Sequence, residues 1–263
     1  SWEGLGLPGA AWATAIAFGV GLGVLGWRIG ETDWLAREGL LEELRASARP
    51  FAGIAGPAMV SQLMPPLAAM LAIAVVASLG EAQVAAWGLA SRLETLSLMV
   101  VLAMTMSLPP WLGRCYGAGD WAQIHRLMRL ALRVIVAWQL LLGLVMAAAA
   151  PWVALALSGN PEVRDDLALL IRFLLPSYAA LGVCMIVVSA GNALGWPLRA
   201  MLMSGARLFI FYLPCLALGA WLGGLLGLAV GAAIGNLMAG LAAWGVLRRI
   251  LASPRRRPLE EAA

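Results

Sequence analysis

The chain has 263 residues, of which 62% are hydrophobic and only 12% are charged, and its mean hydropathy is +0.87. A soluble domain is about 25% charged and about half apolar, so this composition excludes an ordinary soluble protein and predicts a polytopic membrane protein. The formal net charge is +4, and every basic residue is an arginine. The arginines gather in loops and in the C-terminal tail, which favours a role in membrane topology over nucleic-acid binding.

Seven apolar segments follow one another, so we predict an all-α bundle of about seven transmembrane helices. A helix needs about 20 residues to cross a bilayer. The segments are 8–27, 50–79, 82–112, 134–157, 167–190, 199–221 and 224–246. The charged connector before the second segment predicts an amphipathic helix on the membrane surface, with Asp33 as its N-cap; a solvated linker helix is the alternative.

Prolines inside the apolar segments predict where helices are kinked or broken. Proline removes a backbone donor and clashes with the preceding turn. The segment 50–79 carries three of them, so we expect it to be interrupted. The expected positions are Pro57, Pro65, Pro66, Pro176 and Pro214.

The segment 82–112 places Arg92 and Glu94 roughly 15 to 18 Å from its start, near the middle of the hydrocarbon. Charges at that depth are costly and normally face a cavity or a partner. A broken helix beside a helix with mid-membrane charge is typical of the interior of a transporter.

The arginines are divided unevenly between the two sides of the membrane that seven crossings define. One side holds about 14 of them, in the connector 28–49, the loop 113–133, the turn 192–199 and the tail from Arg248. The other side has Arg164, with Arg172 at its edge. By the positive-inside rule the first side is cytoplasmic. We therefore expect a multi-pass protein of a bacterial-type inner membrane with its C-terminus in the cytoplasm.

Two local patterns predict turns. Gly117-Ala118-Gly119-Asp120 predicts a turn followed by the start of a helix, and Gly159-Asn160-Pro161 predicts a second turn.

A glycine recurs at every fourth position near the C-terminus, which predicts a ridge of small residues that lets a neighbouring helix approach closely. The glycines are Gly219, Gly223, Gly227, Gly231 and Gly235. The segments 8–27 and 224–246 also resemble each other in about six of thirteen positions. A six-helix internal repeat would explain this; chance similarity between two glycine- and alanine-rich helices is the alternative.

The residue inventory gives no support to an enzyme, a metal site or a bound cofactor. The cysteines Cys115, Cys184 and Cys215 are widely spaced and form no metal-binding pattern. His125 is the single histidine, and no serine motif accompanies it as a protease would require.

The ordered series of segments and motifs resembles the multidrug and toxic compound extrusion (MATE) family, particularly its DinF-like branch. The resemblance covers essentially the whole chain. The motifs are Gly56-Pro57, Leu79-Gly80-Glu81, Val84-Ala85-Ala86-Trp87-Gly88, Arg92-Leu93-Glu94, Pro110, Gly113, Gly117-Ala118, Asn192-Ala193-Leu194-Gly195, Arg207, Pro214 and Gly224-Leu225-x-Gly227.

Members of this family have two six-helix lobes, so the resemblance implies a division of this chain into four parts. Residues 1–28 would be the last helix of the N-lobe and 29–49 the cytoplasmic linker between lobes. Residues 50–249 would form a six-helix C-lobe and 250–263 a polar cytoplasmic tail. The sequence would then be part of a longer one.

The resemblance also implies an activity. In similar transporters the inward movement of H+ or Na+ drives the export of amphipathic, often cationic, drugs by alternating access. We therefore expect a cation-coupled antiporter of xenobiotics that is a monomer when full length and has no nucleic-acid partner. A flippase for lipid-linked saccharides and a membrane scaffold without transport activity are the alternatives.

Six residues are candidates for the ion or substrate pathway through this resemblance or through their position: Glu94, Arg92, Gln62, Asn192, Arg207 and Thr14. Thr14 matches a polar position near the N-lobe ion site, although its hydroxyl could instead bond to its own helix. Gln62 could face the cavity beside the broken helix, since no carboxylate is present in 50–79. Asn192 could line the cavity or cap a helix end.

Glu94 is the strongest candidate, because its carboxylate could hold a cationic drug or the coupling ion. The alternative is a structural salt bridge. Arg92 lies only two residues away and points to a different side of the helix, so Arg207 from another helix would be the partner.

Overall fold

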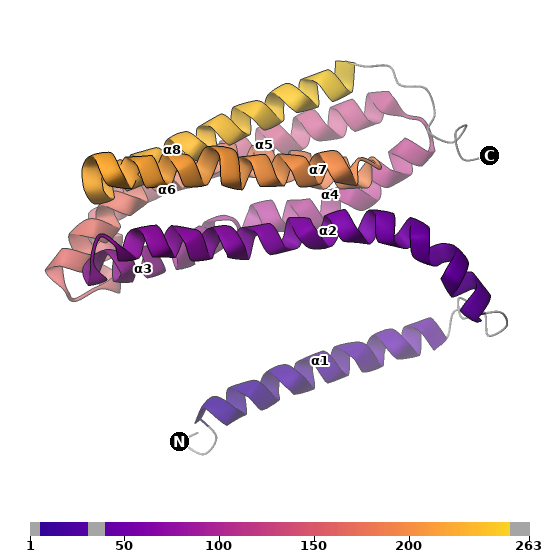
Figure 1. The fold of residues 1–263 in the computed structure, drawn as a ribbon, viewed down its shortest axis with the longest axis horizontal. Coiled ribbons are helices and arrows are strands. Elements are labelled where there is room, and N and C mark those ends of the chain that lie inside the picture. The colour runs from indigo at the N-terminus through magenta and orange to yellow at the C-terminus, as the bar shows by residue number, and fades with distance from the viewer. Residues whose placement is uncertain (1–5, 31–39, 253–263) are drawn as a thin grey trace. The chain divides into compact units, whose positions relative to one another are not determined.

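The computed structural model describes residues 6–30 and 40–252, and every regular element among them is a helix. The predicted all-α class is therefore confirmed. The chain divides into two compact units, residues 1–53 and 54–263. In chain order the helices are α1 (Gly6–Gly30), α2 (Leu40–Ala77), α3 (Glu81–Ser97), α4 (Met99–Gly117), α5 (Trp121–Leu157), α6 (Pro161–Ala193), α7 (Pro197–Gly205), the π-helix η1 (Ala206–Tyr212) and α8 (Leu213–Ala252) (Figure 1).

The predicted linker helix lies only partly within the described residues. Its expected N-cap, Asp33, falls outside them. From Leu40 onward the connector belongs to α2, which continues through residue 50 into the second apolar segment. Residues 40–49 contain strong helix formers and neither glycine nor proline, so nothing in their sequence ends a helix there.

The number of membrane crossings agrees with the prediction. Five helices are long and apolar enough to span, and the bent pair of α3 and α4 makes a sixth. The last candidate, Pro197–Arg249, has 53 residues, or about 80 Å of helix against a hydrocarbon core of about 30 Å. Gly223 and Gly224 interrupt it with non-helical backbone angles, and the φ of 57° at Gly224 suits glycine. Its two arms bring the described residues to seven crossings.

The two arms on either side of this turn pack antiparallel along the predicted glycine ridge. A Cβ on Gly227 would overlap the carbonyl oxygen of Gly219. A Cβ on Gly231 would overlap that of Cys215. From the first contact to the second, the position advances by four residues on the later arm and goes back by four on the earlier arm, as an antiparallel pair requires. Gly223 is different, because it lies in the turn and has no neighbour within 4 Å of an added Cβ.

The break in the bundle lies in a different helix from the one expected. α2 runs without interruption through Pro57, Pro65 and Pro66, which corrects the expectation of a break there. The segment 82–112 is divided instead, because α3 and α4 meet at Leu98 and are bent by 41°. Lipid offers no alternative partner for an interrupted backbone, so a helix that loses one hydrogen bond to a proline still continues.

Pro176 also lies inside a continuous helix, α6, whereas Pro214 adjoins a change of helix type. The seven residues of η1 precede it, and the N–H of Leu213 donates to the carbonyl of Leu208, five residues back. Pro214 has no N–H for the carbonyl four residues earlier, which is compatible with the wider π winding. The predicted segment 199–221 therefore consists of two α-helical pieces with a π-helical piece between them.

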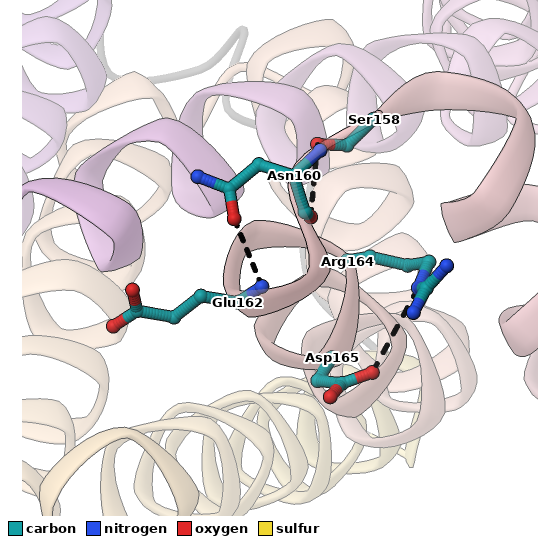
Figure 2. A network of polar contacts seen from close by, with 5 residues as sticks. All are labelled: Ser158, Asn160, Glu162, Arg164 and Asp165. Atoms are coloured by element: carbon teal, nitrogen blue, oxygen red, sulfur yellow. Dashed lines mark hydrogen bonds and ion pairs between the residues drawn. The ribbon is translucent and has the colours of Figure 1, made fainter.

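The predicted turn at Gly159-Asn160-Pro161 leads directly into the start of α6. The side-chain oxygen of Asn160 accepts a hydrogen bond from the N–H of Glu162 at 3.0 Å, and Pro161 is the first residue of the helix (Figure 2). This is an N-cap followed by a proline that has no N–H to leave unpaired. Figure 2 also shows the ion pair between Arg164 and Asp165, whose Nε and Oδ1 atoms lie 4.0 Å apart.

The start of α5 is capped in the same way, because the Asp120 carboxylate accepts from the N–H of Gln123 at 2.9 Å. The predicted turn at Gly117–Asp120 is thereby confirmed. Helices α5 and α6 both begin well before the first residues of the predicted apolar segments, 134–157 and 167–190. Hydropathy marks only the part of a helix that suits lipid, and the polar first turns extend beyond it.

α6 lies at the centre of the second unit and packs against α3, α4, α5, α7 and α8 (Figure 1). It is buried along almost its whole length, from Val163 to Ala190. α5 approaches it closely, since a Cβ on Gly143 would lie 2.7 Å from the Cα of Pro176. This contact fixes the stretch of α6 that carries the polar residues described below.

Replacing Gly227 with alanine should destabilise the protein by about 1–3 kcal/mol, because the new methyl group meets backbone that cannot move aside. Gly245→Ala is the matched control, since it lies in the same arm with nothing within 4 Å. Thermal unfolding of the detergent-solubilised protein, followed by size exclusion, measures both. Equal stability of the two variants would contradict the antiparallel packing.

Candidate functional site

A cavity of about 140 Å³ lies inside the second unit, and five helical elements contribute to its wall. These are α2, α3, α6, η1 and α8. Its volume corresponds to about five water molecules at roughly 30 Å³ each. Its polar lining residues are Ser91, Glu94, Tyr178, Arg207, Tyr212 and Asn236.

Glu94 is held in this cavity by a tyrosine. The hydroxyl of Tyr178 on α6 donates to Oε2 of Glu94 on α3 at 3.0 Å. Tyr178 is 3% exposed, whereas Glu94 is half-buried. A fixed donor therefore orients one carboxylate oxygen, and the group still faces the cavity.

A second polar contact reaches the neighbouring residue of α6. The side-chain amide of Asn236 on α8 donates to the hydroxyl oxygen of Ser177 at 3.0 Å, and this hydroxyl donates to the carbonyl of Leu174 at 2.6 Å. Asn236 and Ser177 are both buried. Ser177 and Tyr178 thus tie α8 and α3 to the same turn of α6.

Arg207 supplies the opposite charge on the cavity wall and comes from η1. The structure describes both Arg207 and Glu94, and they form no ion pair within 4.0 Å. The expected salt bridge between Glu94 and Arg207 is therefore not observed. One carboxylate and one guanidinium face the same small space without neutralising each other directly.

The remaining candidates lie outside this cavity. Arg92 and Gln62 are exposed and are absent from its lining. Asn192 is also exposed and lies in the last turn of α6, where its backbone carbonyl accepts from Gly195 at 3.3 Å. Thr14 is an exposed residue of α1, in the first unit.

Sequence reasoning missed five polar residues of the site: Ser91, Ser177, Tyr178, Tyr212 and Asn236. The usable signal was their position, because a lone polar residue in an apolar span usually faces the bundle interior. Asn236 is the clearest case, as the one asparagine between Gly224 and Val246. Gln139 on α5 carries the same signal, and it accepts from Ser97 at 3.3 Å in a buried contact near the bend at Leu98.

Known proteins resemble this chain along most of its length. The MatE family model matches residues 57–218. The chain is 33% identical over 248 residues to a protein of Shewanella oneidensis named FAD transporter, covering 94% of this chain and 55% of that protein. It is 31% identical over 148 residues to the probable multidrug resistance protein NorM of Deinococcus radiodurans, covering 56% of this chain and 27% of that protein.

Solved structures agree with the sequence matches. The Vibrio cholerae MATE transporter VcmN in its bent form is 44% identical and superimposes with a TM-score of 0.85 over 94% of this chain and 56% of VcmN. The structure of a point mutant of VcmN gives a TM-score of 0.88 with the same identity and coverage. This chain spans about half the length of these relatives. The matches do not distinguish a DinF-like branch, which stays a prediction.

Removing the Tyr178 hydroxyl should lower stability by about 1.5–3 kcal/mol, the range for a hydrogen bond to a charged group. Tyr178→Phe leaves the ring in place and leaves Glu94 without its donor. Tyr116→Phe is the matched control, since it keeps the edge-to-face contact with Trp121 at 5.7 Å between ring centroids. Thermal unfolding of both variants measures the difference, and an unchanged midpoint for Tyr178→Phe would show that the contact is not formed.

Proposed function

The chain belongs to the MATE family of membrane transporters, and from that premise we propose that it works in a cation-coupled antiporter that exports amphipathic compounds by alternating access. Glu94 would bind the coupling ion, either H+ or Na+. The observation that carries this proposal is a half-buried carboxylate that faces a cavity, is oriented by Tyr178 and forms no ion pair with Arg207.

The size of the cavity favours an ion over a drug as its occupant. Drug-sized ligands occupy pockets of roughly 300–1,000 Å³, whereas this cavity measures about 140 Å³. It has room for an ion with a few water molecules. In this conformation we therefore assign Glu94 to ion coupling, and an amphipathic substrate would need a wider opening of the bundle.

The charges give a physical basis for exchange. With Glu94 ionised, its charge and that of Arg207 cancel over the cavity as a whole. When H+ or Na+ binds Glu94, the cavity becomes net positive and repels a cationic substrate. Binding of the cation and binding of a cationic substrate would then oppose each other, as antiport requires.

A flavin nucleotide is a second candidate substrate, favoured by the relative named FAD transporter. Arg207 and three aromatic side chains, Trp87, Tyr178 and Tyr212, lie on the cavity wall. A guanidinium suits phosphate, and aromatic rings stack on a flat ring system.

The first test measures ethidium accumulation in drug-sensitive cells that express the complete open reading frame encoding this chain. We expect lowered accumulation that is lost with an uncoupler or on removal of Na+, according to the ion used. Glu94→Gln should abolish efflux at equal expression, because the amide cannot take up a proton and binds a cation weakly.

Glu81→Gln is the matched control, with the same chemical change in the same helix at an exposed first-turn position. It should export like the parent. A Glu94→Gln variant that exports like the parent would overturn the coupling role of Glu94. A parent that lowers accumulation of none of several cationic dyes would overturn drug export.

The second test measures FAD released into the medium by the same cells. If a flavin nucleotide is carried, Arg207→Gln should reduce release on the order of tenfold, as loss of one charge-assisted hydrogen bond implies. Arg92→Gln is the control, because Arg92 is exposed outside the cavity. FAD release equal to that of cells without the gene would remove this candidate.

A further inference from the structure

A long furrow on the second unit is separate from the polar cavity. α5 and α8 form its walls and α6 its floor, and its volume is about 1000 Å³. The lining is almost entirely apolar, as Val136 and Leu140 of α5, Val183 of α6 and Leu241 of α8 illustrate. We call this feature the α5–α8 furrow.

The floor of the furrow is made of small residues. Ala179 and Ala180 of α6 lie there, and a Cβ on Gly240 of α8 would come within 2.7 Å of the Cβ of Ala180. α8 is therefore seated directly on α6 at this point. The larger side chains of α5 and α8 stand on either side, which leaves a trough along the bundle surface.

One end of the furrow is basic. Arg129 and Arg133 of α5 line it, and both are exposed. On the opposite wall Arg248 lies over the ring of Trp244 at 5.1 Å from the centroid. Neither Arg129 nor Arg133 forms an ion pair with any residue that the structure describes, and no acidic residue lines the furrow.

The two arginines lie at the depth of a lipid headgroup region when α5 is centred in the bilayer. The midpoint of this 37-residue helix is Gln139. Arg129 is ten residues away, or about 15 Å, which is half the thickness of the hydrocarbon core. Arg133 lies about 9 Å from the midpoint, within reach of the same boundary because a long side chain extends toward the headgroups.

We propose that the α5–α8 furrow binds an anionic phospholipid, with its phosphate at Arg129 and Arg133 and an acyl chain along the apolar trough. Phosphate pairs well with the planar guanidinium group. Two exposed arginines without acidic partners favour a lipid of net negative charge over a zwitterionic one. Basic pockets between transmembrane helices commonly hold such headgroups. This inference depends on the chain lying in a membrane and is independent of what it transports.

The test uses proteoliposomes with two photoactivatable lipids, phosphatidylglycerol and phosphatidylcholine, that carry the same diazirine acyl chain. Mass spectrometry of the crosslinked peptides locates the label. We expect phosphatidylglycerol to label peptides of α5, α6 and α8 that line the furrow, in preference to phosphatidylcholine. The preference should fall as the salt concentration rises, since an exposed phosphate–arginine contact is screened.

Two variants separate the headgroup site from the trough. Arg129→Gln with Arg133→Gln should reduce the phosphatidylglycerol preference by about fivefold per arginine, as about 1 kcal/mol for each basic residue near the membrane surface implies. Ala137→Phe fills the trough from an exposed position on α5 and should reduce labelling by both lipids alike. The matched control is Arg114→Gln with Arg199→Gln, which removes two exposed arginines outside the furrow.

Three results would overturn the proposal. Equal furrow labelling by the two lipids in the unmodified protein would show ordinary contact with bulk lipid. An equal loss of preference in the control pair would show a general effect of net charge. Label confined to peptides outside the furrow would place the lipid elsewhere. The comparison of the two lipids and its salt dependence use the unmodified protein, so the inference remains testable if a variant fails to fold.

Discussion

The absence of hydrogen-bonding partners in lipid is the constraint on which the rest of this structure depends. A backbone group exposed to hydrocarbon costs several kcal/mol, so helices continue wherever they can. This explains why α2 and α6 pass through prolines without ending. It also explains why irregular helix geometry is confined to places where the backbone groups still form hydrogen bonds. At Leu98 the bonds continue across the bend, since its N–H donates to Glu94 and its carbonyl accepts from Leu102.

The same constraint makes α6 the organising element of the second unit. A buried polar side chain needs a partner on another helix, and two of these contacts end on adjacent residues of α6. Tyr178 donates a hydrogen bond to Glu94 of α3, and Ser177 accepts one from Asn236 of α8. The close approach of α5 at Gly143 fixes the same stretch from the other side. Movement of α3 or α8 relative to α6 would therefore break or re-form a defined polar contact.

Hydropathy and turn chemistry predicted the helices because these signals are local. The turn at Gly159-Asn160-Pro161 and the glycine ridge of α8 depend on neighbours in sequence or on a fixed period, and both were found as expected. The bend at Leu98 and the π winding of η1 were not predicted, because each depends on packing between helices. Glu94 was found from its depth in the span. Tyr178 could not be predicted as its hydrogen-bond donor, since nothing in the sequence shows which residue of α6 faces α3.

The separation of Glu94 from Arg207 gives the proposed mechanism its physical basis. A direct salt bridge would saturate the carboxylate and hold α3 against η1, so that a coupling ion would first have to displace the guanidinium. The hydrogen bond from Tyr178 constrains the carboxylate less than a salt bridge would, because the hydroxyl orients one oxygen and leaves the charge in place. A cation that binds there is opposed by a positive charge on the wall of the same cavity, which limits its affinity. An ion site in an antiporter needs this limit, since it must release its ion in every cycle.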